Sequence, residues 1–165
     1  MTKRNLTLQT KQRKGETRIP AGLSVWQHEL ETANALATAG FIVEFLKTKT
    51  VKNTKSPDIA MAGFKWEIKS LIAYKLSEVE RNLKRAYHQS ESIIFDSHRM
   101  GKLPDKSIQK ELEKQFKLTK KVKRLLFINR KREVIDISKL AWYYLNTRSP
   151  HGAGCSYRGD FFFVV

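Results

Sequence analysis

Two carboxylates lie close together in the segment SPDIAMAGFKWEIKS, residues 56–70. Alternating apolar residues predict two strands, roughly 57–61 and 64–70, which a short turn joins into a hairpin. The expected register sets Asp58 opposite Glu67 on one face of this hairpin. Like charges that face each other destabilise a sheet. A divalent cation between the two carboxylates would turn this repulsion into coordination.

The register depends on the turn, which we place at Ala62-Gly63. This turn pairs Met61 with Phe64, and strand alternation brings Lys69 to the face of the two carboxylates. A hard cation such as Mg²⁺ takes oxygen ligands and keeps water molecules for chemistry. Beside it, Lys69 would orient or deprotonate an attacking water and stabilise charge on a phosphate. The alternative is a solvated face on which Lys65 and Lys69 neutralise the acids.

The charge balance indicates a polyanionic partner. The 165 residues include 32 Lys and Arg against 16 Asp and Glu, a formal net charge of +16. Such a surplus destabilises the compact state through self-repulsion, and nucleic acid offers phosphates that neutralise it. An anionic membrane surface and an acidic protein remain alternatives. No apolar run is long enough for a membrane span, and the first twenty residues lack a signal-peptide core.

The remaining pattern predicts one α/β (α+β) domain, a single mixed β-sheet flanked by helices. A basic flexible arm, residues 1–20, precedes the domain proper, residues 21–138, and an extension, residues 139–165, is expected to pack on it. Cys155 is the single cysteine, so no intrachain disulfide is expected. Helices are expected over 24–40, 76–92 and 105–118, and further strands over 41–46, 93–96, 124–128 and 133–137.

Other candidates lie on the predicted helix 76–92 and after the strand 93–96. Arg85 and Gln89 share the flank beside the apolar stripe of this helix, where they would contact a phosphate or a metal-bound water. Ordinary solvated positions are the alternative. Asp96 is a weaker candidate, because aspartate is also common at turns. The further basic residues expected to contact substrate are Lys65, Arg81 and Arg99.

The hairpin also resembles a known signature. Pro57-Asp58, followed after a Gly-containing turn by Glu67-Ile68-Lys69, is similar to the motif of the PD-(D/E)xK nuclease superfamily. A closer resemblance, over about residues 28–137, is to the tRNase subgroup of C-terminal toxin domains of contact-dependent growth-inhibition and related polymorphic-toxin proteins. Its four blocks are HELETANALATAGFIVEF, SPDIAMAGFKWEIKS, RNLKRAYHQSESIIFD and KRLLFINRKREVIDI.

This resemblance implies a tRNA-cleaving toxin that a secreted carrier delivers into the cytoplasm of a neighbouring bacterium. It also implies a cognate immunity protein, expected to be acidic. Asp58 and Glu67 would be metal ligands, Lys69 the catalytic lysine, and Glu29 the acid from the first helix that completes the metal site. The implied metal is Mg²⁺, with Mn²⁺ or Zn²⁺ as alternatives.

Three rival functions stay open at this point. A DNA endonuclease of a mobile element would use the same site, because the metal contacts only phosphate. A basic nucleic-acid-binding module would leave the carboxylate pair inert. A metal-independent ribonuclease would use His88 or His98 as acid and base. The four histidines show no metal-ligand spacing to one another: His28, His88, His98 and His151.

Overall fold

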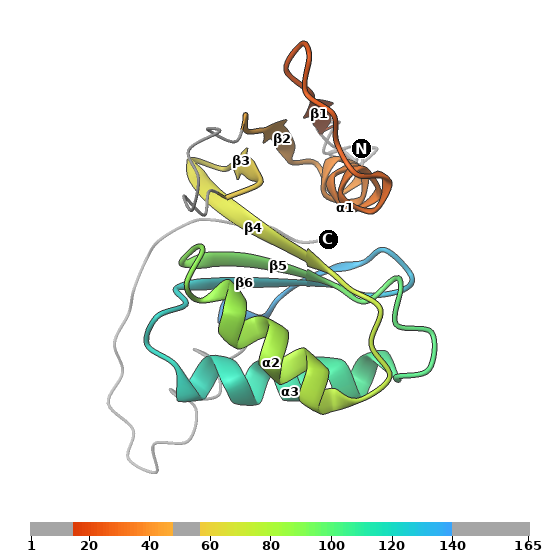
Figure 1. The fold of residues 1–165 in the computed structure, drawn as a ribbon, viewed down its shortest axis with the longest axis vertical. Coiled ribbons are helices and arrows are strands. Elements are labelled where there is room, and N and C mark those ends of the chain that lie inside the picture. The colour runs from red at the N-terminus through yellow and green to blue at the C-terminus, as the bar shows by residue number, and fades with distance from the viewer. Residues whose placement is uncertain (1–14, 48–56, 140–165) are drawn as a thin grey trace, which may run out of the picture.

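The computed structural model describes residues 15–47 and 57–139, which form a seven-stranded mixed sheet with three helices (Figure 1). The strands neighbour one another in chain order: β1 (Glu16–Arg18), β2 (Ile42–Phe45), β3 (Ile59–Met61), β4 (Phe64–Ser70), β5 (Ser92–Asp96), β6 (Arg124–Ile128) and β7 (Val134–Asp136). The helices are α1 (Gln27–Thr38), α2 (Leu76–Ala86) and α3 (Asp105–Leu118). The predicted single mixed sheet with flanking helices is confirmed.

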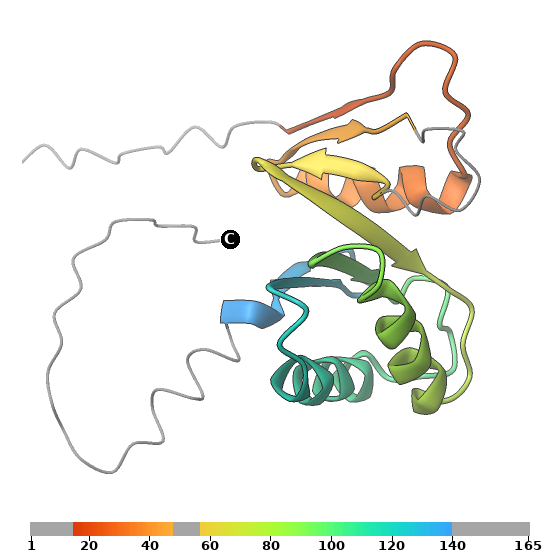
Figure 2. The same ribbon diagram turned by 60° about the vertical axis from the view of Figure 1, so that its left-hand side comes forward.

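Strand β4 joins two halves of the molecule. It pairs with β3 in antiparallel and with β5 in parallel orientation. Figure 1 shows α1 with β1–β3 on one side of β4, and β5, β6, α2 and α3 on the other; Figure 2 shows the same division from a second direction. Residues on β4 therefore lie at the junction between the halves.

Two apolar cores cover opposite faces of the sheet. On β5, Ile93 and Phe95 pack into the core built with α2 and α3, whereas Ile94 packs into the core built with α1. This division follows from the alternation of side chains along a strand. Every residue of β5 is buried. Because β5 is buried on both faces and pairs with β4, it helps to fix the position of the residues on β4.

The hairpin has the register that the sequence predicts. Met61 pairs with Phe64, and Ile59 pairs with Trp66. Gly63 has a φ of +79° and Ala62 a φ of +52°, as the two-residue turns of tight hairpins require. Just before β3, the backbone N–H of Asp58 donates to the Trp66 carbonyl at 3.0 Å. Asp58 therefore continues the pairing toward Glu67.

The structure differs from the predicted arm and from two predicted helix ends. Part of the expected arm, Glu16–Arg18, is strand β1, which pairs in parallel with β2. This pairing uses backbone groups, so the polar side chains of the segment do not reveal it. Helix α1 begins at Gln27 rather than near residue 24, and α2 ends at Ala86 rather than near 92. Residues 1–14, and residues 140–165 of the expected extension, lie outside the described residues.

A buried ion pair fastens α1 to the sheet. Asp96, at the end of β5, is 1% exposed and accepts hydrogen bonds from Arg132 Nη1 at 2.8 and 3.0 Å. Thr32 of α1 donates to the same carboxylate at 2.6 Å, and Arg132 also donates to the Glu31 carbonyl. We call Thr32, Asp96 and Arg132 the clamp. Asp96 is thus a structural residue in this fold and not a member of the candidate active site.

Candidate active site

The hairpin brings the three predicted catalytic side chains together. Asp58 Oδ2 accepts a hydrogen bond from the Ile68 backbone N–H at 2.7 Å, which fixes the carboxylate against β4. On β4 itself, Lys69 Nζ forms an ion pair with Glu67 Oε1. Strand alternation explains this contact, because residues two apart lie on the same face. Asp58, Glu67 and Lys69 therefore form one cluster, as the register predicts.

Gln89 joins this cluster through the lysine. Lys69 Nζ donates to Gln89 Oε1 at 2.8 Å. Gln89 lies in the turn after α2, where its N–H donates to the Ala86 carbonyl at 2.9 Å. The neighbouring Ser90 hydroxyl donates to the Lys65 carbonyl at 3.0 Å and ties this turn to β4. In this structure the Gln89 side chain contacts the lysine, and its predicted contact with a substrate stays a prediction.

Glu29, from α1, lies within electrostatic reach of the hairpin carboxylates. Burial raises the pKa of Glu29, and the negative charge of Asp58 raises it further. The charge of His28 acts in the opposite direction on the pKa of both Glu29 and Asp58. Sequence reasoning missed His28 as a neighbour of this site. Its position next to Glu29 in the chain is the signal that would have suggested it.

Burial leaves the cluster with poorly solvated negative charge. It raises the pKa of Asp58 and of Glu67, and the charges of Asp58 and Glu29 raise the pKa of Glu67 further, whereas Lys69 lowers it. Glu67 is only 3% exposed, and its Oε2 atom is buried without a hydrogen-bond partner among residues 15–47 and 57–139. A buried carboxylate oxygen without a partner costs free energy. A bound cation or a proton would relieve this cost.

The carboxylate oxygens of the cluster are suitable ligands for a hard divalent cation. Their side chains do not, however, have the arrangement of a complete metal site. Within residues 15–47 and 57–139, no three His, Cys, Asp or Glu side chains are placed so that they could hold a metal ion as they stand. One oxygen of Asp58 is bonded to Ile68, and one of Glu67 is paired with Lys69. Carboxylate oxygens are the ligands that Mg²⁺ prefers, and within the described residues Glu67 Oε2 has no hydrogen-bond partner.

Glu29→Gln is expected to raise the melting temperature at neutral pH by about 1–3 °C, because it removes one of several mutually repelling, partly buried charges. The pKa of Glu29 is higher in the folded state than in the unfolded state. Ionisation of Glu29 therefore destabilises the folded state as the pH rises above the ordinary glutamate pKa. Below the ordinary glutamate pKa of about 4.3, both proteins carry a neutral side chain and the difference disappears. Thermal melts at about pH 3.5 and about pH 7.5 check this. The prediction is wrong if Glu29→Gln and the unmodified chain have equal melting temperatures at neutral pH as well as at acidic pH.

The four basic side chains predicted to contact substrate lie outside the cluster. Arg81 and Arg85 are exposed on α2, Lys65 is exposed on β4, and Arg99 donates to the Ser70 carbonyl at 3.3 Å. Among the described residues, no hydrogen bond or ion pair connects these four basic side chains to Asp58. Their assignment as substrate contacts therefore stays a prediction.

Comparison with known proteins adds a family match and a fold match. Residues 55–134 match the family described as the contact-dependent growth inhibition CdiA C-terminal domain. The chain is similar in fold to a solved structure described as the CdiA-CT/CdiI toxin and immunity complex from Burkholderia pseudomallei. The TM-score is 0.53 at 12% sequence identity, over 74% of this chain and 95% of that chain. No match was found among curated proteins.

The family match covers the part of the chain that carries the cluster. Residues 55–134 include β3, β4, α2, β5, α3 and β6, and with them Asp58, Glu67 and Lys69. Glu29 lies before the matched region. Among the described helices, none combines the length and the apolar character needed to cross a membrane.

Proposed function

We propose that this chain is the toxin domain of a contact-dependent growth-inhibition system and that it hydrolyses phosphodiester bonds of tRNA with the help of a divalent metal ion. The observation that carries the enzymatic part is the buried carboxylate pair with its lysine: Asp58, Glu67 and Lys69 on one hairpin. In the part of the chain that the structure describes, Glu67 Oε2 is buried without a hydrogen-bond partner, which costs stability that a bound cation would restore. The net charge of +16 supports a polyanionic substrate.

Each residue of the cluster has a role in this proposal. Asp58 and Glu67 would hold the ion, with Glu29 as a third acid, and Mg²⁺ fits their oxygen donors best. The ion would polarise the phosphate and lower the pKa of a bound water. Lys69 would orient that water and stabilise the charge that develops on the phosphate. Gln89 would keep the lysine in position through its 2.8 Å hydrogen bond.

The family match supports the biological setting of this proposal. The solved complex pairs a toxin with an immunity protein. By analogy, this chain would be carried into a target bacterium by a secreted protein and would act in its cytoplasm. An acidic immunity protein would complement the basic surface. Transfer RNA as the substrate rests on the resemblance of the four sequence blocks, since the metal and the carboxylates do not distinguish RNA from DNA.

Cleavage assays with the purified 165-residue chain test the proposal. Total tRNA and a DNA duplex would each be incubated with Mg²⁺, Mn²⁺ or Zn²⁺, and separately with EDTA. We expect discrete tRNA fragments with a divalent metal and none with EDTA. Cleavage of DNA alone would retain the site and reject tRNA as the substrate. Equal cleavage in EDTA would move the chemistry to the histidines, and no cleavage of either substrate would reject the enzymatic proposal.

A further inference from the structure

Helix α2 has an exposed polar face outside the carboxylate cluster. A shallow pocket of about 450 Å³ lies on it. Among the described residues, those that line it are polar or charged: Ser77, Glu80, Arg81, Lys84, Arg85 and His88. The opposite side of the helix packs into the core through Val79, Leu83 and Ala86. The basic residues of the pocket therefore do not contribute to the apolar core. Their positive charge suggests a role in binding an anionic partner.

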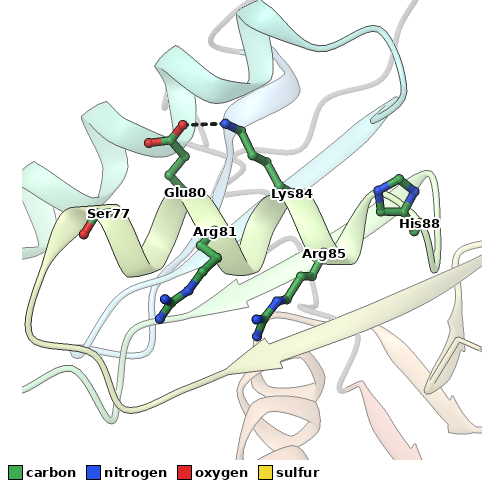
Figure 3. Close-up of a pocket in the computed structure, with 6 residues that line it drawn as sticks. All are labelled: Ser77, Glu80, Arg81, Lys84, Arg85 and His88. Atoms are coloured by element: carbon green, nitrogen blue, oxygen red, sulfur yellow. Dashed lines mark hydrogen bonds and ion pairs between the residues drawn. The ribbon is translucent and has the colours of Figure 1, made fainter.

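The two arginines of this pocket point the same way. Figure 3 shows Arg81 and Arg85 extending from one side of α2, on the side away from α3, whereas Glu80 and Lys84 lie toward α3. Lys84 is paired with Glu80 at 2.6 Å, so its charge is largely compensated. Arg81 has a loose contact with Glu78 at 3.9 Å. Arg85 has no ion pair within the described residues. Within the described residues, neither guanidinium group is therefore held by a close ion pair.

The spacing of these arginines suits a chain of phosphates. Residues four apart on a helix are separated by about 6 Å along its axis and lie on nearly the same side. Guanidinium groups bind phosphate oxygens in pairs, which a lysine ammonium does not. A row of two arginines can therefore contact two phosphates of one strand.

The row leads toward the carboxylate cluster. Gln89 lies four residues after Arg85, in the turn that closes α2, and accepts a hydrogen bond from Lys69 at 2.8 Å. A strand lying along Arg81 and Arg85 would thus reach Lys69 next. We propose that α2 is the track for one strand of the nucleic-acid substrate, with Arg81 and Arg85 on adjacent phosphates. This inference rests on the proposed function and adds the surface that positions the strand.

The character of the pocket favours nucleic acid over an acidic protein as the occupant. Protein interfaces have an apolar centre, often with aromatic side chains. Among its described lining residues there is no Phe, Tyr, Trp or aliphatic side chain. Phosphate contacts along an open, polar surface are typical of sequence-independent strand binding. Binding of an acidic protein to the same face is the competing outcome of the test.

Binding of a fluorescently labelled single-stranded RNA to the full chain, followed by anisotropy in EDTA, tests the inference without cleavage. The variant is the double substitution R81Q/R85Q, and its charge-matched control is K106Q/K110Q, two exposed lysines at the same spacing on α3. We expect R81Q/R85Q to weaken binding about tenfold at low salt. The slope of log K against log salt should fall by about 1.4, since each single-strand phosphate contact contributes about 0.7. The control should change both quantities much less.

Several results would overturn the inference. Equal losses of RNA affinity in R81Q/R85Q and K106Q/K110Q would indicate that only the general positive charge matters. Unchanged RNA binding in R81Q/R85Q together with lost binding of a poly-glutamate peptide would assign the face to an acidic protein. The substitutions R81K/R85K, which keep the charge, should retain most of the salt slope. Because EDTA prevents metal-dependent cleavage, failure of this test is separate from failure of the nuclease assay.

Discussion

Replacing Lys69 with methionine is expected to lower the rate of tRNA cleavage by about 10²- to 10⁴-fold at saturating Mg²⁺. Methionine has a similar length but no charge, so it neither orients water nor stabilises negative charge on the phosphate. The matched control is Lys123→Met, because Lys123 forms an exposed ion pair with Glu91 at 2.7 Å. Single-turnover cleavage rates of the two variants and the unmodified chain give the comparison.

A second substitution at this position separates two roles of the lysine. Lys69→Arg keeps a positive charge but does not lose its proton at accessible pH. If Lys69 stabilises charge, Lys69→Arg should retain much of the activity; if Lys69 deprotonates the water, both variants should be equally slow. A Lys69→Met rate like that of Lys123→Met would remove the lysine from the chemistry.

Replacing Arg132 with alanine is expected to lower the free energy of unfolding by about 3–5 kcal/mol. The reason is that Asp96 is 1% exposed and would lose both of its hydrogen bonds from Arg132. An unpaired buried carboxylate is far more costly than a broken surface pair. Urea unfolding of the full chain measures the difference.

The control for the clamp is Arg130→Ala in the same turn region. Arg130 pairs with Asp105 at 3.4 Å, with both side chains partly exposed, so its loss should cost less than about 1 kcal/mol. The double variant Asp96→Asn with Arg132→Met should be more stable than Arg132→Ala, since no charge is left buried. Equal costs for Arg130→Ala and Arg132→Ala would show that the clamp is not a significant anchor.

The clamp also connects stability to the site. Arg132 holds α1 through Asp96 and the Glu31 carbonyl, and α1 carries Glu29. The third acid of the candidate metal site therefore depends on a turn about one hundred residues away in the chain. No sequence pattern around Arg132 or Glu31 predicts this long-range contact.

The parts of the fold that sequence predicted best are those set by local patterns. The hairpin follows from apolar alternation around Gly63, whose positive φ suits the turn. Helix α3 has the predicted bounds, 105–118, because its apolar residues recur at helical spacing between clear breaks. Since the site residues lie on the hairpin, the closeness of Asp58 and Glu67 was predictable from the same pattern.

The parts that sequence missed depend on tertiary contacts. Trp26 lies within the predicted helix 24–40, but α1 begins after it and its side chain is 72% exposed. Thr32 is fully buried in spite of its hydroxyl, because Asp96 accepts its hydrogen bond. Strand β1 is held by backbone pairing to β2, which leaves no apolar pattern in Glu16–Arg18. The nearness of His28 to the site depends on how α1 packs.

We propose above all that the hairpin carboxylates form the catalytic metal site. The most direct measurement is the rate of tRNA cleavage with Mg²⁺ by Asp58→Asn, compared with Glu91→Gln, which neutralises an exposed carboxylate elsewhere. Asparagine keeps the size of Asp58 and an oxygen that can accept from the Ile68 N–H, so the hairpin should persist. We predict cleavage at least about 10²-fold slower in Asp58→Asn and unchanged in Glu91→Gln. Equal cleavage rates in Asp58→Asn and Glu91→Gln would show that Asp58 is not part of a catalytic metal site.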